Sequence, residues 1–92
     1  MVSCVLKYKI NLSEETGITI PKGSEILHIG EQNDALFAWV LVSDRMAKAD
    51  LFVPLAVHGT GHQIGEGTRD YIQTVRMKNG LVWHVFYRDG GK

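Results

Sequence analysis

The sequence is poor in features that define several classes of protein. It has one cysteine, Cys4, among 92 residues, so no intramolecular disulfide can form and a reducing cytoplasm is the expected location. The longest apolar run, Ala35–Val42, is far shorter than the roughly 20 residues that a membrane-spanning helix needs. The N-terminus lacks the basic and long apolar regions of a signal peptide. We therefore predict a cytoplasmic protein that has no membrane partner.

The chain also lacks an excess of charge of either sign. Ten Lys and Arg balance ten Asp and Glu, and 45% of the residues are hydrophobic, which excludes a disordered chain. Proteins that bind nucleic acid usually carry a basic excess or stripe, so no nucleic-acid partner is predicted. Neutrality removes repulsion between copies and favours a homo-oligomer. The length predicts a single β-rich domain over residues 1–92, with residues 89–92 as a frayed tail.

Alternation of apolar and polar residues predicts strands along most of the chain. Residues 2–12 alternate and predict a half-buried strand with Cys4 on the core face. Ala35–Val42 has no polar face, which predicts a central strand covered on both sides. Pro54 lies in the middle of residues 51–58 and cannot donate a ladder hydrogen bond, so this segment is predicted to be an edge strand or to carry a bulge.

Residues 71–77 and 81–87 are predicted to form a hairpin around Asn79-Gly80. Asn-Gly is typical of a two-residue type I′ turn, in which both residues have positive φ. This turn would pair Val75 with His84 and would place Trp83 on the opposite face from Val75. Both faces of the hairpin carry apolar residues, so we expect both to be covered, and another subunit is one candidate for the second cover.

Shorter strands are predicted at residues 18–20 and 25–29, and residues 43–50 suit a loop or a single helical turn equally well. The total is about seven short strands. The predicted fold class is all-β: a small antiparallel β-sandwich or partly open barrel with at most one helical turn.

Residues 58–69 form the stretch whose composition is typical of a binding site. Four of the ten glycines fall within residues 59–67. Glycine-rich loops can direct backbone N–H groups into one concavity that suits a phosphate, and Arg69 could add a bidentate contact. A long glycine-rich turn without a ligand is the alternative. His58 and His62 have neither a helix nor a cysteine pair to complete a metal site, so no metal and no cofactor are predicted.

The aromatic residues offer a second group of candidates. Trp39 and Trp83 could stack on a nucleobase-like ring, although core packing explains the two tryptophans more simply. His84 lies between Val82 and Phe86, which suits a core histidine bonded to the backbone better than a catalytic one. No spacing supplies a nucleophile with a positioned base, so an enzyme is not expected and no catalytic residue is predicted. The predicted ligand-binding residues are His58, Gly59, Thr60, Gly61, His62, Arg69, Trp39 and Trp83.

Two segments of the chain are specific in sequence, namely Gly59-Thr60-Gly61-His62 and the closing Val82-Trp83-His84-Val85-Phe86. With further segments along nearly the whole chain, they resemble a family of short, uncharacterised proteins of tailed phages and prophages. Asp34 and Gln63 stand where the family usually has a glycine and often has a proline. The resemblance implies a phage-encoded, cytoplasmic accessory protein, and it implies no established activity.

Two functions are compatible with these observations. The first is a non-enzymatic accessory protein that binds and sequesters a small anionic, nucleotide-like ligand, such as a host-defence signal. Backbone N–H groups and Arg69 would hold its phosphate, and an aromatic side chain would stack on its base. The alternative is a protein–protein interaction module, either an inhibitor of a host protein or a self-assembling component, for which the neutral charge and the apolar hairpin are the support.

Overall fold

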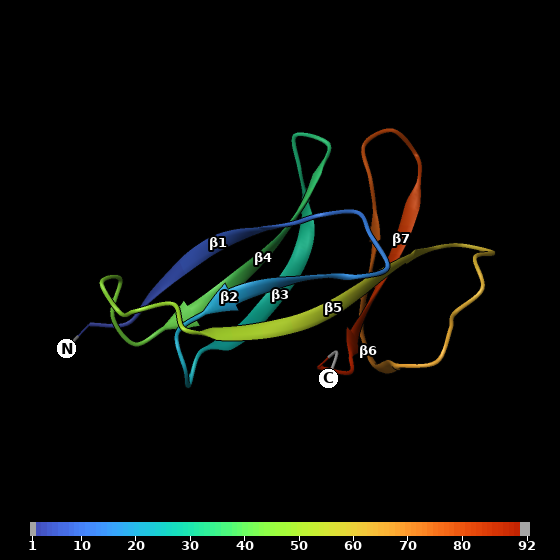
Figure 1. Ribbon diagram of the computed structural model, residues 1–92. Helices are drawn as coiled ribbons and strands as arrows, with labels where there is room; N and C mark the ends of the chain where they lie inside the picture. Colours follow the sequence, from blue (N-terminus) through green and yellow to red (C-terminus); the bar gives the residue numbers. More distant parts are fainter. Residues whose placement is uncertain (1, 91–92) are drawn as a thin grey trace.

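Seven strands make up two antiparallel sheets (Figure 1). The computed structural model describes residues 2–90, which contain no helix. The first sheet has the order β1-β4-β3 and the second the order β2-β5-β7-β6, which confirms the predicted all-β sandwich, and no barrel closes. The strands are β1 (Cys4–Ile10), β2 (Thr16–Ile20), β3 (Glu25–Gln32), β4 (Ala35–Val42), β5 (Leu51–Gly59), β6 (Thr68–Arg76) and β7 (Val82–Arg88).

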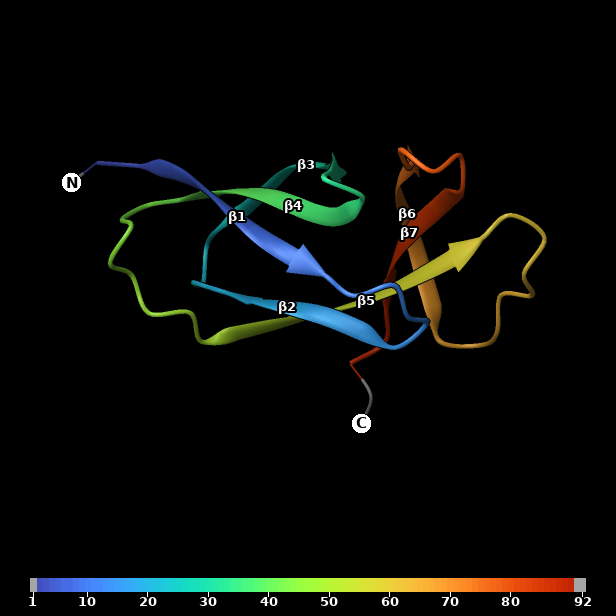
Figure 2. The same ribbon diagram turned by 90° about the horizontal axis from the view of Figure 1, so that it is seen from above.

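The two sheets overlap along part of their length only. Figure 2 shows β1 and β4 lying over β2 and the first half of β5, whereas β6 and β7 stand at the other end of β5 and cross it steeply. Strand β5 joins these regions because residues 51–55 pair with β2 and residues 55–59 pair with β7. The second half of β5 therefore carries the chain away from the first sheet to the end of the molecule where the glycine-rich segment follows.

The prediction that residues 51–58 form an edge strand or carry a bulge was wrong, since β5 lies between β2 and β7 and pairs with both without a register shift. Pro54 is tolerated because it pairs with Gly17 of β2 but forms no ladder pair with β7. Pairing with β7 begins one residue later, at Leu55, and the Arg88 side chain donates from Nε to the Leu55 carbonyl oxygen at 3.0 Å. The missing N–H of proline thus costs no ladder hydrogen bond on that side.

The core lies between the facing sides of the two sheets. In β1 the side chains alternate as predicted, and Cys4 packs partly buried against the core. In β4 every second side chain, from Leu36 to Val42, is fully buried. The fully buried core also includes Ile10, Ile29, Leu55, Val57 and Val85.

The prediction that Ala35–Val42 is covered on both sides was wrong. The outer face of β4 carries Phe37 and Trp39, which are half-buried by neighbours in their own sheet rather than by another layer. Lys7 Nζ lies 4.6 Å from the centre of the Phe37 ring, and the His28 and Trp39 rings lie 5.7 Å apart. The apolar run therefore reflects one core face and one face sheltered by long side chains.

The hairpin between β6 and β7 has a different register from the predicted one. Val75 pairs with Trp83, Met77 N–H donates to the Leu81 carbonyl at 2.7 Å, and of the loop residues 78–80 only Gly80 has positive φ, at 93°. These are the features of a three-residue loop ending in a left-handed glycine, not of a type I′ turn. The one-residue shift places Trp83 and Val85 on the core face together with Val75.

The type I′ geometry is instead found between β3 and β4. Asn33 and Asp34 have φ values of 54° and 63°, and Gln32 pairs with Ala35 across them. Glu31 supports the turn by accepting a hydrogen bond from the Asp34 N–H at 2.7 Å. A non-glycine residue therefore occupies a position at which glycine is favoured.

Residues 43–50 form a turn rather than a helical turn, with Ala47 N–H donating to the Asp44 carbonyl at 2.9 Å.

At the other end of the chain, Asp89 N–H donates to the Gly67 carbonyl at 2.7 Å, so the segment predicted to be frayed begins with a bonded residue. Residues 91 and 92 of that segment lie outside the described residues. Within the described range no helix is long and apolar enough to cross a membrane.

Gln73 joins the two sheets where β3 and β6 approach each other. Its Oε1 accepts a hydrogen bond from the backbone N–H of Ile29 at 3.0 Å, and its Nε2 lies 3.3 Å from His28 Nδ1. Strand β3 is an edge of the first sheet, so Gln73 provides a partner for a backbone group that the ladder leaves free.

We expect Gln73→Leu to lower the free energy of unfolding by about 1–3 kcal/mol, because the Ile29 N–H is left without its partner beside a fully buried side chain. Urea denaturation of the variant measures the loss. Gln63→Leu, on an exposed part of the chain, is the control and should stay within about 0.5 kcal/mol of the parent. Equal effects of the two substitutions would show that Gln73 does not join the sheets.

We expect Asp34→Gly to raise the free energy of unfolding by about 0.5 kcal/mol. Removing the Cβ relieves the left-handed conformation of Asp34 and outweighs the added entropy of glycine in the unfolded chain. Asp50→Gly, at an exposed position without positive φ, should be destabilising in the same urea experiment. Destabilisation by both substitutions would contradict the proposed strain at Asp34.

Candidate functional site

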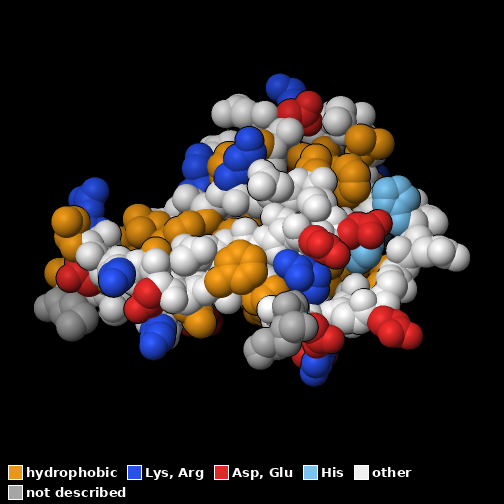
Figure 3. All heavy atoms as spheres, viewed as in Figure 1, with side chains coloured by type: hydrophobic (Ala, Val, Ile, Leu, Met, Phe, Trp, Pro, Cys, Tyr) orange, Lys and Arg blue, Asp and Glu red, His pale blue; other side chains and the backbone are white. Residues whose placement is uncertain are grey.

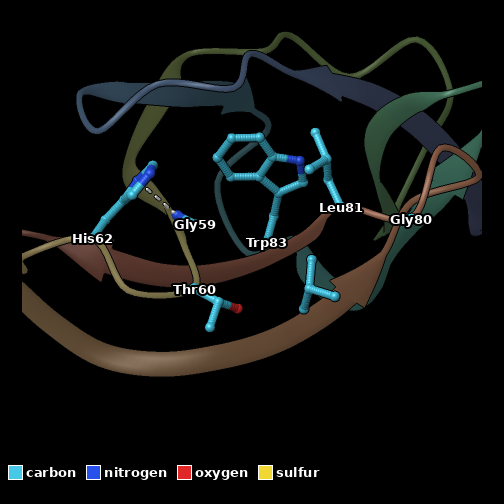
Figure 4. Close-up of a pocket in the computed structure, with 7 residues that line it drawn as sticks. Gly59, Thr60, His62, Gly80, Leu81 and Trp83 are labelled. Carbon is cyan, nitrogen blue, oxygen red and sulfur yellow. Dashed lines mark hydrogen bonds between the residues drawn. The ribbon is translucent and has the colours of Figure 1, made fainter.

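A cleft of about 300 Å³ opens at the end of the second sheet where β5 leaves it and β7 enters it (Figure 4). One wall is the turn that follows β5, and the other is the loop between β6 and β7. Figure 4 shows the Trp83 indole standing between His62 on one side and Leu81 on the other. The lining residues are Gly59, Thr60, His62, Gly80, Leu81, Val82 and Trp83.

The turn at residues 59–62 is closed by two hydrogen bonds between its end residues. His62 N–H donates to the Gly59 carbonyl at 3.1 Å, and Gly59 N–H donates to His62 Nδ1 at 3.1 Å. Gly61 supplies the left-handed residue that so tight a turn requires, with φ of 90°. Because Nδ1 accepts, the neutral His62 ring carries its proton on Nε2, which is left as a donor.

Gly59 is needed because the His62 ring lies directly over it. A Cβ atom at residue 59 would come within 2.9 Å of His62 Cε1, closer than side chains pack. The φ of Gly59 is not positive, so the requirement comes from space and not from backbone conformation. The first glycine of the Gly-Thr-Gly-His segment thus permits the last residue to fold back over the strand.

Trp83 forms the floor of the cleft. It pairs with Gly59 across the sheet and packs partly buried against the core, on the same face as Val85. The His62 and Trp83 rings meet edge to face, with centroids 6.2 Å apart and planes inclined at 71°. Its indole nitrogen Nε1 is buried and has no hydrogen-bond partner.

A chain of hydrogen bonds holds the turn from the opposite face of the second sheet. Thr60 Oγ1 lies 2.8 Å from His84 Nε2, and His84 Nδ1 lies 2.9 Å from Thr74 Oγ1. The Thr74 hydroxyl is in turn 2.8 Å from the Tyr71 hydroxyl. His84 therefore bonds to two threonine side chains rather than to the backbone, which corrects the prediction for this residue.

His58 faces His84 across β5 and β7 and lies on the same outer face, away from the cleft. It is 2% exposed, and its Nε2 lies 3.4 Å from Thr68 Oγ1. The His58 and Phe86 rings meet edge to face, with their centroids 5.8 Å apart. Its Nδ1 is buried without a partner. Among the residues that the structure describes, no three His, Cys, Asp or Glu side chains come together to hold a metal ion.

The structure brings Gly59, Thr60, His62 and Trp83 to the cleft and places the other predicted site residues elsewhere. Gly61 lies within the turn, and Trp39 lies on the outer face of the first sheet. Arg69 Nη1 pairs with Asp89 Oδ1 at 2.7 Å, and this hydrogen bond raises the pKa of the exposed Arg69 guanidinium. Figure 3 shows acidic and basic side chains scattered over the face it displays, without a continuous basic patch.

Leu81, Val82 and Gly80 were missed as site residues, since their part in the cleft follows from the three-residue loop that the Asn-Gly pair did not predict. The His84 chain was missed for the same reason, because the predicted register turned His84 toward the core face. In the observed register, His58 and His84 are cross-strand neighbours that face outward. With the correct loop length, the sequence would have placed His84 on this outer face.

A family model described as a domain of unknown function (DUF7352) matches residues 1–92. No curated protein and no solved structure matches the chain. The site must therefore be interpreted from its own geometry.

We expect Gly59→Ala to displace the His62 ring from the cleft, because the new Cβ would overlap it. The expected result is a change in the ring-current shifts of the Trp83 indole protons in the NMR spectrum, with the fold retained. Gly65→Ala is the matched control, since a Cβ there meets nothing within 4 Å. Unchanged Trp83 signals in Gly59→Ala would show that His62 does not depend on the space above Gly59.

Proposed function

We propose that this chain, which belongs to the DUF7352 family, is a non-enzymatic protein that binds and sequesters a small nucleotide-like ligand. The observation that carries the proposal is the cleft in which the Trp83 indole stands between His62 and Leu81. An aromatic floor with a flanking imidazole suits a flat ring, since stacking of a base on an aromatic side chain contributes about 1–3 kcal/mol.

The size of the cleft limits which part of the ligand it holds. Its volume of about 300 Å³ is at the lower end of the range for small-molecule sites, so it suits one ring system rather than a whole nucleotide. No Lys, Arg, Asp or Glu is among the lining residues. We therefore propose that the base of the ligand binds in the cleft and that its phosphate lies outside the cleft.

The glycine-rich segment beside the cleft is the proposed place for the phosphate. Residues 60–66 are exposed and belong to no strand, so their backbone N–H groups, apart from that of His62, which donates to the Gly59 carbonyl, are open to a ligand. Gly61 and Gly67 both have positive φ, a conformation that helps successive N–H groups converge on an anion. Arg69 is already paired with Asp89, so backbone groups rather than Arg69 carry this part of the proposal.

The resemblance to proteins of tailed phages supports a more specific role. A phage accessory protein that acts in the host cytoplasm and binds a nucleotide without turnover would lower the free concentration of a nucleotide signal used in host defence. The Gly-Thr-Gly-His segment, one of the two that carry this resemblance, also supplies one wall of the cleft.

A second candidate function is a protein–protein interaction module that assembles with itself or binds a host protein. The observation that favours it is the outer face of the first sheet, where Phe37 and Trp39 are half-buried without a covering layer. Native mass spectrometry separates the two candidates. A mass excess that is lost on denaturation supports the ligand, whereas a bare multiple of 10.3 kDa supports assembly.

We expect His62→Ala to weaken binding of a nucleoside monophosphate by about 2- to 10-fold, since it removes one aromatic contact at the cleft. Isothermal titration with AMP, GMP, CMP and UMP measures the affinities. Trp39→Phe, on the first sheet, is the control and should leave them unchanged, as should Arg69→Ala.

Two results would count against this proposal. One is that none of the four nucleotides binds the parent protein at millimolar concentration. The other is that Trp39→Phe weakens binding as much as His62→Ala, which would remove the cleft as the site.

A further inference from the structure

The Trp83 indole N–H is an unpaired donor at the floor of the cleft. Among the buried side-chain nitrogen and oxygen atoms of the described residues, only Trp83 Nε1 and His58 Nδ1 have no hydrogen-bond partner. Buried polar groups are almost always paired, and an unpaired one costs about 1–3 kcal/mol. His58 Nδ1 is on the other face of the sheet, so Trp83 Nε1 is the one at the cleft.

A surface side chain lies on the side of the indole that carries this donor. In Figure 4 the nitrogen-bearing edge of the indole faces Leu81, and the other edge faces His62. Leu81 is 55% exposed and lies next to the three-residue loop of the hairpin. Because Leu81 is a surface side chain outside the core cluster, we infer that its rotation into solvent opens Nε1 to a molecule in the cleft.

We propose that the cleft recognises a flat heterocycle bearing an exocyclic carbonyl oxygen, which accepts a hydrogen bond from Trp83 Nε1–H. This inference rests on the proposed function and names the class of ring. An exocyclic oxygen projects beyond the edge of its ring and can reach past Leu81 to the donor, whereas a ring nitrogen is part of the ring edge and stands further back. An exocyclic amino group would place a donor against a donor.

The other polar side chains at the cleft agree with this preference. The neutral His62 ring offers the Nε2–H donor, because its Nδ1 accepts from Gly59. The Thr60 hydroxyl is occupied by His84. No lining side chain provides a carboxylate or amide oxygen, so the side chains of the cleft present donors to a ligand that brings acceptors.

Inosine and purine riboside make a matched pair of probes, since they differ in the 6-oxo group and the N1 proton that accompanies it. We expect the parent protein to bind inosine at least about 10-fold more tightly in isothermal titration, because only inosine satisfies the buried donor. In Trp83→Phe, which keeps an aromatic ring without the N–H, the two affinities should become equal. Trp39→Phe should preserve the preference.

NMR provides a readout that does not depend on the folding of Trp83→Phe. The indole N–H signal of Trp83, identified by comparison with Trp39→Phe, should move downfield with inosine and move less with purine riboside. Equal affinities in the parent, or no difference between the two shifts, would overturn the carbonyl inference and leave the cleft as a ring-binding site. Tighter binding of AMP, which has no exocyclic carbonyl, than of GMP would do the same, whereas no binding by any of the six probes would overturn both proposals.

Discussion

The division of β5 between two partners is the constraint on which the structure depends. Its first half pairs with β2 beneath the first sheet, and its second half pairs with β7 beyond that sheet. Because Gly59 at the end of β5 pairs with Trp83 near the start of β7, the glycine-rich turn and the tryptophan meet at one place. The cleft is thus a consequence of how far β5 extends past the sandwich core.

The strands could be predicted from the sequence because the alternation in β1 and the apolar run of β4 record burial directly. The register of the last hairpin could not, since Asn79-Gly80 suits both a two-residue and a three-residue loop. Only the choice between these loops decides whether Trp83 faces the core side or the solvent side. Asn33-Asp34 shows the converse, as it forms the type I′ turn without the glycine that would have indicated it.

The candidate site was predictable to the extent that it is local in sequence. Gly59, Thr60 and His62 belong to one turn, so composition identified them, and Trp83 joins them through a strand pairing. Arg69 is close in sequence yet is held by Asp89 from the end of β7, and no spacing rule reports such a competing partner. Trp39 belongs to the other sheet, and which sheet a strand enters is decided by long-range pairing alone.

The turn at residues 59–62 is held from both faces of the sheet, and this bears on how it would bind a ligand. On the cleft side, the Gly59 N–H fixes the His62 ring. On the outer side, His84 fixes the Thr60 hydroxyl and is itself fixed by Thr74. A wall restrained in this way loses little conformational entropy when a ring enters, so more of the stacking energy is retained as affinity. Of the outer hydrogen-bond chain, only Thr60 also lines the cleft, and the other members support it from the opposite face. This arrangement is possible because successive side chains of β7 alternate between faces, so that Trp83 and His84 point to opposite sides of the sheet.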